Sequence, residues 1–264
     1  MVTLPLLVLA ILKGGPWLFL LLAAVICVGA LWELLALLVP ESRPGWRLAT
    51  CVPALWLLGG FALAPGGLGG AGPLWPLVFL TGALFLLMAG HLATYGRAGA
   101  LAEMGFQALA LLYLPFLLGH LVWLRLLSGG EWWVLWLLAV IFAGDTAAYY
   151  TGRSFGRHRL SPRVSPGKTW EGTAGGLAAS LLAGVAAGVG LLPEAPLRLL
   201  APLALTLGGV GVLGDLFESM LKRLAQVKDA GSLLPGHGGL LDRLDSLLFA
   251  GPVVLYARLL VFGP

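Results

Sequence analysis

Apolar segments of about 20 residues recur along most of the chain, separated by short stretches that are polar or rich in glycine and proline. About 20 residues of helix cross a hydrocarbon core of roughly 30 Å, whereas a membrane β-barrel would alternate apolar and polar positions. The pattern therefore predicts an all-α polytopic membrane protein. We expect about nine helices, the first of them short, at about residues 2–13, 17–39, 47–65, 74–92, 105–127, 131–151, 171–192, 197–220 and 243–262.

The composition supports a membrane protein, because 59% of the 264 residues are hydrophobic, only 11% are charged and the mean hydropathy is +0.95. We expect one transmembrane domain over residues 1–264, with N-terminal helices in 1–130 and the catalytic helices and loops in 131–264. No basic region precedes the first apolar run, and Lys13 follows it, so we expect a first span rather than a signal peptide. No nucleic-acid partner is expected.

Basic residues divide unevenly between the two sides of the predicted helices. If the N-terminus is placed on one side, that side carries 12 of the 16 basic residues. Cytoplasmic loops are enriched in lysine and arginine, so this side is predicted to be cytoplasmic, in a bacterial-type inner or cell membrane. The 12 residues are Arg43, Arg47, Arg97, Arg153, Arg157, Arg159, Arg163, Lys168, Lys222, Arg223, Lys228 and Arg243, against Lys13, Arg125, Arg198 and Arg258 on the other side.

The densest charge lies between Gly214 and Ser246, in a chain with only 16 basic and 12 acidic residues. On the helix predicted to end at about residue 220, Asp215 is followed at helical spacing by Glu218, Ser219 and Lys222, which places them on one face. A carboxylate at membrane depth costs about 2.5–3.5 kcal/mol, so it faces a cavity, a partner or an ion. An ion pair of Asp215 with Lys222 or Arg223 is the purely structural alternative.

Two further carboxylates, Asp242 and Asp245, lie at the start of the last predicted helix, near the positive end of its dipole. Asp242 is a candidate N-terminal cap, whereas Asp245 is predicted to lie inside the helix. Because one loop joins the helices of Asp215 and Asp245, these carboxylates can converge. Mg²⁺ is usually held by a few carboxylates together with phosphate oxygens, so the pattern predicts a Mg²⁺ site here, with Asp242 as a third ligand or a cap.

The loop between these helices contains the stretches from Lys228 to Gly231 and from Pro235 to Gly239. Glycine lets backbone N–H groups approach an anion closely, and Lys222, Arg223 and Lys228 supply positive charge. We interpret the loop as one that wraps a polyphosphate. A solvated basic loop that contacts anionic lipid headgroups is the alternative.

A second polar region follows the predicted helix 131–151. Asp145 lies near the cytoplasmic end of that helix, where an isolated acid is either a functional group or a link between helices. The loop after it contains Lys168. Thr169 or Ser165 is predicted to cap the next helix, whose N-terminus would form an anion site beside Lys168.

Two glycine patterns do not predict a nucleotide-binding fold. Gly209, Gly211 and Gly214 match G-x-G-x-x-G, but they lie in an apolar span and not after a strand, so we interpret them as positions of close helix packing. The stretch from Gly167 to Thr169 resembles the end of a P-loop, yet Pro162 stands where the first glycine of that motif would be.

The region from Ser219 to Asp245 resembles the signature of the phosphatidate cytidylyltransferase family, also called CDP-diacylglycerol synthases. The stretches from Asp145 to Tyr149 and from Ser165 to Gly172 resemble that family as well. One departure is Gly167, where a second lysine beside Lys168 would be expected. The matching signature residues are Ser219, Lys222, Arg223, Lys228, Asp229, Gly231, Pro235, Gly236, His237, Gly238, Gly239, Asp242, Arg243 and Asp245.

The resemblance implies that CTP and phosphatidic acid are converted to CDP-diacylglycerol and pyrophosphate in phospholipid biosynthesis. It also implies Mg²⁺, a second cation such as K⁺, and a homodimer. The implied metal ligands are Asp215, Asp242 and Asp245, with Asp145 as a further candidate. The implied catalytic residues are Asp215, Asp245, Lys222 and His237. The implied substrate contacts are Lys168, Ser219, Lys222, Arg223, Lys228, Asp229, His237, Gly238, Gly239 and Arg243.

Three other functions remain open at this point. A CTP-dependent polyprenol or isoprenoid lipid kinase, or a CDP-lipid synthase acting on another lipid, would share the nucleotide site. An ion-coupled transporter would use Asp145, Asp215 and Asp245 as proton or cation sites near the centre of the membrane. The predicted position of these acids toward the cytoplasmic side argues against the transporter.

Overall fold

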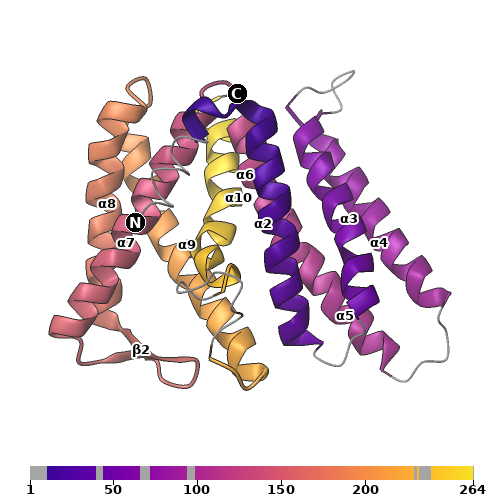
Figure 1. The fold of residues 1–264 in the computed structure, drawn as a ribbon. Helices are drawn as coiled ribbons and strands as arrows, with labels where there is room; N and C mark the ends of the chain where they lie inside the picture. Colours follow the sequence, from indigo (N-terminus) through magenta and orange to yellow (C-terminus); the bar gives the residue numbers. More distant parts are fainter. Residues whose placement is uncertain are drawn as a thin grey trace. The chain divides into compact units, whose positions relative to one another are not determined.

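The computed structural model describes residues 11–39, 44–65, 72–93, 99–228, 231 and 239–263. Most of them are helical, and Figure 1 shows the elements along the chain. The helices are α2 (Gly15–Leu38), α3 (Pro44–Leu63), η2 (Gly72–Leu74), α4 (Trp75–Leu92), α5 (Ala100–Leu111), η3 (Leu112–Phe116), α6 (Leu117–Leu126), α7 (Gly130–Phe155), α8 (Trp170–Leu191), α9 (Leu197–Leu224), η4 (Leu241–Arg243) and α10 (Asp245–Leu260), and the strands are β1 (Arg159–Ser161) and β2 (Ser165–Thr169).

Seven helical segments in the described part of the chain are long and apolar enough to cross a membrane. One of them is continuous through α5, η3 and α6, and η3 is a π-helical turn that contains Pro115. These segments confirm the predicted all-α multi-pass membrane protein but not the count of about nine. With 16 residues, α10 is shorter than a typical span of about 20. The predicted helix 2–13 lies outside the described residues except for its last three.

Several boundaries differ from the prediction. The helix expected to start at 105 starts at Ala100, because Gly99 with φ of +77° provides the left-handed residue that precedes it. The helix expected to end at 220 runs to Leu224, and the helix expected to start at 243 starts at Asp245. The polar stretch between α7 and α8, expected to be a loop, contains the antiparallel pair β1–β2.

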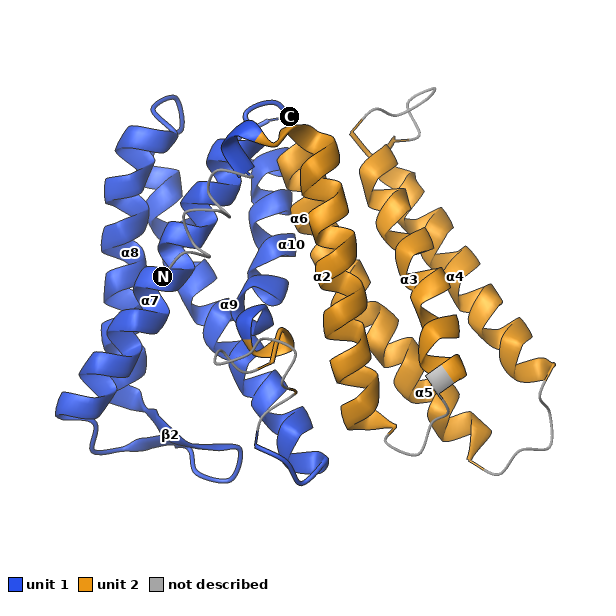
Figure 2. Ribbon diagram, in the orientation of Figure 1, with its two compact units in different colours: residues 1–13, 127–228, 243–264 blue, residues 14–126, 229–242 orange. Residues whose placement is uncertain are grey.

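The chain divides into two compact units, coloured separately in Figure 2. In the described residues, unit 1 contains α7, the β1–β2 hairpin, α8, α9 and α10. Unit 2 contains α2 to α6 and also Gly231 and residues 239–242. The middle of the signature thus belongs to the unit of the N-terminal helices, whereas both of its ends belong to unit 1.

In unit 1, α7 and α8 pack closely because α8 presents a small residue at every fourth position. Ser180 donates a hydrogen bond to the carbonyl oxygen of Val140 (3.1 Å), and the fully buried indole of Trp136 donates to that of Gly184 (2.8 Å). Small residues let helix backbones approach and polar groups bond between them in a membrane. The buried residues of this face are Gly172, Gly176, Ser180, Gly184 and Gly188.

The glycines of α9 also serve helix packing. A Cβ atom on Gly211 would lie 3.2 Å from the Ile141 side chain on α7, and one on Gly214 would meet the backbone of Asp245 on α10. This confirms the interpretation of the G-x-G-x-x-G match as a packing motif. Gly214 brings the first residue of α10 next to α9, one position before Asp215.

The core of unit 2 is built around Phe61 of α3, which is 1% exposed. Its ring packs against Gly119 and lies edge-on to Phe116, with ring centroids 5.5 Å apart. His120 donates a hydrogen bond to the carbonyl oxygen of Phe116 (2.8 Å), in the turn that the π-helix widens. Apolar packing and local hydrogen bonds therefore hold this part of the membrane domain together.

Candidate active site

The polar face predicted on α9 is present in unit 1. The Ser219 hydroxyl donates to Oδ1 of Asp215 (3.3 Å), and Nζ of Lys222 donates to Oε2 of Glu218 (3.2 Å). Both pairs join residues four apart, as expected for one side of a helix. Glu218 is 1% exposed, so this face is turned into the protein at that level. The helix thus presents two carboxylates, a hydroxyl and an ammonium group side by side.

Lys168 reaches this face from the β1–β2 hairpin. Its Nζ lies 2.5 Å from Oδ2 of Asp215, and both side chains are partly buried. The next residue, Thr169, caps α8 by accepting a hydrogen bond from the Gly172 N–H (3.1 Å), which confirms one of the two predicted caps. Strand, cap and helix start therefore fix the backbone on either side of Lys168.

Two further contacts hold the hairpin. Glu171, in the first turn of α8, accepts hydrogen bonds from the backbone N–H groups of Arg157 (3.1 Å) and His158 (3.2 Å). At the other end, Nε of Arg223 on α9 donates to the carbonyl oxygen of Val164 (3.2 Å), in the hairpin turn. Arg223, predicted to contact phosphate, thus also anchors the hairpin that carries Lys168.

The sequence predicted Asp245 inside the last helix. In the structure, Asp245 is instead the first residue of α10. Its Oδ1 accepts a hydrogen bond from the backbone N–H of Ser246 (2.7 Å). The carboxyl group is close enough to Asp215 and Asp145 to interact with their charges. Acids from α7, α9 and α10 therefore lie near one another at this end of unit 1. Like charges this close concentrate negative charge that a cation can relieve.

The donor set fits Mg²⁺. Carboxylate oxygens are the hard ligands that this ion prefers, and it usually takes only one or two of them and keeps water or phosphate oxygens in its other positions. Among the residues that the structure describes, no three His, Cys, Asp or Glu side chains form a metal site by themselves. Asp215 and Asp245 offer ligands of the kind that Mg²⁺ takes, and metal binding by them stays a prediction.

The predicted polyphosphate loop falls partly outside the described residues. Asp229, His237 and Gly238 lie there, and their predicted roles stay predictions. Lys228 is exposed just beyond α9, and Arg243 is exposed in η4.

Asp242 does not cap the last helix, so this prediction was wrong. Its Oδ2 accepts a hydrogen bond from the Gly239 N–H (3.1 Å), within unit 2. Asp242 lies in η4, and α10 begins at Asp245 after Leu244, without a side-chain cap hydrogen bond. Metal binding by Asp242 stays a prediction.

Glu33 was not among the predicted site residues. It lies in α2, is 3% exposed, and its Oε2 accepts a hydrogen bond from the backbone N–H of Leu241 (3.0 Å). A single carboxylate within an otherwise apolar span marks a functional candidate, so the sequence held this signal. What the sequence did not show is which part of the chain it contacts.

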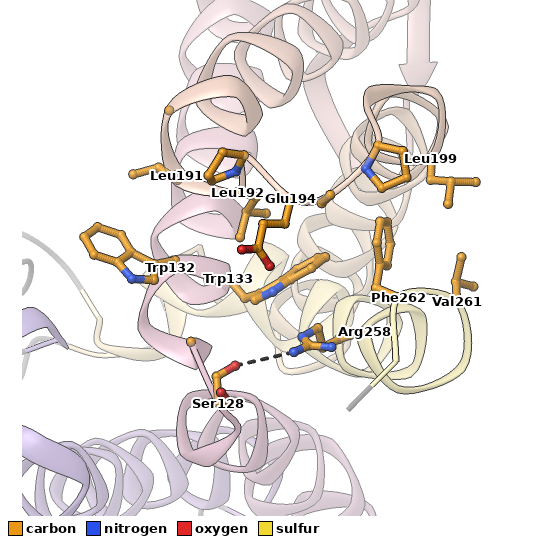
Figure 3. A pocket seen from close by; sticks show the side chains of 15 residues that line it. Ser128, Trp132, Trp133, Leu191, Leu192, Glu194, Leu199, Arg258, Val261 and Phe262 are labelled. Carbon is orange, nitrogen blue, oxygen red and sulfur yellow. Dashed lines mark hydrogen bonds between the residues drawn. The ribbon is translucent and has the colours of Figure 1, made fainter.

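A cavity of about 690 Å³ opens at the other end of unit 1 (Figure 3). Its lining includes Trp133 at the start of α7, Glu194 between α8 and α9, and Arg258 near the end of α10. Trp133 and Asp145 are separated along α7 by 12 residues, or about 18 Å of helix. None of the predicted site residues lines this cavity, so it is separate from the carboxylate cluster.

Comparisons with known proteins point to one family. Residues 1–261 match the profile of the Cytidylyltransferase family. The chain is 38% identical over 243 residues to the phosphatidate cytidylyltransferase of Pseudomonas aeruginosa, covering 92% of this chain and 88% of that protein. It is 43% identical over 164 residues to the phosphatidate cytidylyltransferase of Bacillus subtilis, and 40% identical over 186 residues to the uncharacterized protein YnbB of Escherichia coli.

Coverage differs among these relatives. The aligned part spans 60% of the Bacillus subtilis protein and 62% of YnbB, which is less than two thirds of each. The match to the Pseudomonas aeruginosa protein extends over most of both chains. The comparisons confirm the family resemblance inferred from the signature residues.

Proposed function

Because the chain belongs to the Cytidylyltransferase family, we propose that it transfers the cytidylyl group of CTP to phosphatidic acid, forming CDP-diacylglycerol and pyrophosphate. The observation that carries the proposal is the ion pair of Lys168 with Asp215, near the charges of Asp145 and Asp245, in a chain of this family. Such a cluster can hold a cation and a polyphosphate together, as nucleotidyl transfer requires.

The reaction needs little covalent help from the protein. A phosphate oxygen of phosphatidic acid attacks the α-phosphorus of CTP, a new P–O bond forms, and the bond to the β-phosphate bridging oxygen breaks to release pyrophosphate. The attacking phosphomonoester has a second pKa near 6, so it is largely ionised at neutral pH and needs no strong general base. The obstacle is repulsion between two anions, together with the charge that builds on the leaving group.

Positively charged side chains of unit 1 can offset this repulsion. Lys168 is held by Asp215 on one side and by the hairpin backbone on the other. Its ammonium group is therefore already positioned before phosphate binds. Lys222, which pairs with Glu218, supplies a second positive charge on α9, the helix that also carries Asp215. Arg223 and Lys228 are the further phosphate contacts in this proposal.

Asp215 and Asp245 would hold Mg²⁺, with Asp145 as a nearby acid that adds to the negative charge. When bound, Mg²⁺ neutralises phosphate charge and stabilises the leaving pyrophosphate. In this proposal the site faces the cytoplasm, where CTP is available and where the basic loops are predicted to lie. A second cation such as K⁺ and a homodimer belong to the proposal as well.

The test is a substrate assay on the purified protein in detergent or lipid nanodiscs with Mg²⁺. We expect CDP-diacylglycerol and pyrophosphate from CTP and phosphatidic acid, and no product after chelation with EDTA. CTP-dependent phosphorylation of a lipid alcohol, with no product from phosphatidic acid, would instead identify a lipid kinase. Cation flux in liposomes without nucleotide turnover would identify a transporter.

A further inference from the structure

The chain around the signature glycines converges on one buried carboxylate in unit 2. Glu33 accepts a hydrogen bond from the Leu241 N–H (3.0 Å). A Cβ atom on Gly231 would lie 2.5 Å from Cδ and 2.7 Å from Cγ of Glu33, and one on Gly239 would lie 3.2 Å from Oε2. Three points of the signature, from Gly231 to Leu241, therefore touch the same side chain.

The two glycines are required here for space. Neither has a positive φ, so any residue could adopt their backbone conformations. An added methyl group on Gly231 would overlap the Glu33 side chain, and one on Gly239 would come within 2.9 Å of Asp242 Oδ2 and 3.0 Å of the Gly231 nitrogen. Heavy atoms essentially never lie within 3.0 Å of a Cβ, so a larger residue at either position would displace a carboxylate side chain or the chain itself.

Asp242 completes the arrangement. It accepts a hydrogen bond from the Gly239 N–H, while Glu33 accepts one from Leu241, so two carboxylates hold alternate amides of one short stretch. Charge-assisted bonds of this kind are about twice as strong as neutral ones. The stretch is therefore fixed to α2, a helix far from it in sequence.

We propose that Glu33 is a positioning residue for CTP binding: it holds the signature residues Gly231, Gly239 and Leu241 in place. This inference rests on the proposed function for its nucleotide and on the contacts of Glu33 for its geometry. It gives α2 a part in holding signature residues of its own unit.

The first experiment measures amide hydrogen exchange of the full-length protein in nanodiscs, without substrates. We compare Glu33→Met, which removes the acceptor, with Glu33→Gln, which keeps an acceptor oxygen of similar reach. We expect faster exchange in peptides covering residues 239–242 for Glu33→Met and near wild-type exchange for Glu33→Gln. Unchanged exchange in Glu33→Met, or faster exchange throughout α2 to α6, would overturn the proposal.

The second experiment is kinetic. Glu33→Met should raise KM for CTP by about tenfold to a hundredfold, as expected for loss of a hydrogen bond to a charged group, with KM for phosphatidic acid changed less than about twofold. Glu33→Gln should restore most of the CTP affinity. An equal rise in both KM values, or no rescue by glutamine, would show a general structural role and overturn the proposal.

Two further variants serve as controls for these measurements. Glu103→Met removes another buried glutamate of unit 2, on α5, and should leave the exchange of residues 239–242 unchanged. Gly231→Ala should mimic Glu33→Met, and their combined effect should be smaller than the sum, because both disturb one contact. Additive effects, or equal local exchange in Glu103→Met, would contradict the assignment. If the wild type lacks the proposed activity, the exchange measurements still decide the role of Glu33.

Discussion

The carboxylates of the two units are stabilised in different ways. In unit 1, Asp215 is bonded to an ammonium group and a hydroxyl, and the charges of Asp145 and Asp245 lie close to it. In unit 2, Glu33 accepts a hydrogen bond from the chain's own backbone and packs against two glycines. The first arrangement places several acidic groups close together. In the second, one carboxylate holds a backbone segment in place.

This difference separates two roles of acids in a membrane domain. Like charges in proximity are unfavourable unless a cation joins them, so the cluster in unit 1 suits a bound metal and an anionic substrate. A carboxylate satisfied by amide groups needs no such partner and can be replaced by a neutral acceptor. Changing carboxylate to amide at both places therefore tests the comparison directly.

The largest effect is expected at the cluster. Asp215→Asn or Asp245→Asn should lower the turnover of CTP with phosphatidic acid by about a thousandfold or more, because metal binding supplies several kcal/mol of charge stabilisation. The same change of group at Glu33, to Gln, should alter turnover by no more than about threefold, because the hydrogen bond persists. Initial rates at saturating Mg²⁺ measure both.

Folding is the control for these variants. Elution from a sizing column and the thermal unfolding midpoint should match the wild type, since asparagine keeps the shape of aspartate. Full activity in Asp245→Asn would remove the metal assignment. A Glu33→Gln enzyme as inactive as Asp215→Asn would erase the distinction between the two units.

A smaller effect is expected at Lys168. Lys168→Met should lower kcat/KM for CTP by about tenfold to a hundredfold, the range for losing a hydrogen bond to a charged group. Lys168→Arg, which keeps the charge, should recover part of the loss. The measurement is a CTP titration at fixed phosphatidic acid.

Lys228→Met offers a matched comparison for Lys168, because Lys228 is exposed beyond α9 whereas Lys168 is partly buried against Asp215. We expect the smaller loss at Lys228. Equal losses would mean that both lysines contact phosphate to the same extent. No loss at Lys168 would reduce that residue to a counterion of Asp215.

The smallest effect is expected at the cap beside Lys168. Thr169→Val removes the acceptor for the Gly172 N–H and should lower stability by about 1 kcal/mol, or roughly 2–4 °C in the unfolding midpoint for a chain of this size. Thr169→Ser keeps the hydroxyl and should stay near the wild type. A midpoint unchanged in Thr169→Val would show that the hairpin holds α8 without the cap.

Much of the fold was predictable because the length of an apolar segment is a local property. Segments of about 20 apolar residues gave the helices and the class of protein. The hairpin at residues 159–169 escaped prediction because its residues are polar and basic and show no apolar alternation. The small residues at every fourth position of α8 were visible in the sequence, but their packing partner on α7 was not.

The candidate site was predictable in its parts. Helical spacing placed Asp215, Ser219 and Lys222 on one face, and the family resemblance pointed to Asp245 and Lys168. The pairing of Lys168 with Asp215 could not be read from spacing, because it joins a hairpin to a distant helix. Glu33 was overlooked for the same reason, since its contacts lie at the other end of the chain.

The sequence by itself determined the membrane environment, the family and the residue types available for chemistry, because hydropathy, helical period and motif spacing are set by neighbours along the chain. Tertiary structure alone decided which charges lie close together and which backbone N–H groups donate hydrogen bonds to a buried acid. Those contacts depend on how closely the chain segments approach: Gly214 lets α9 approach α10, and Gly231 lets its own segment approach Glu33 of α2.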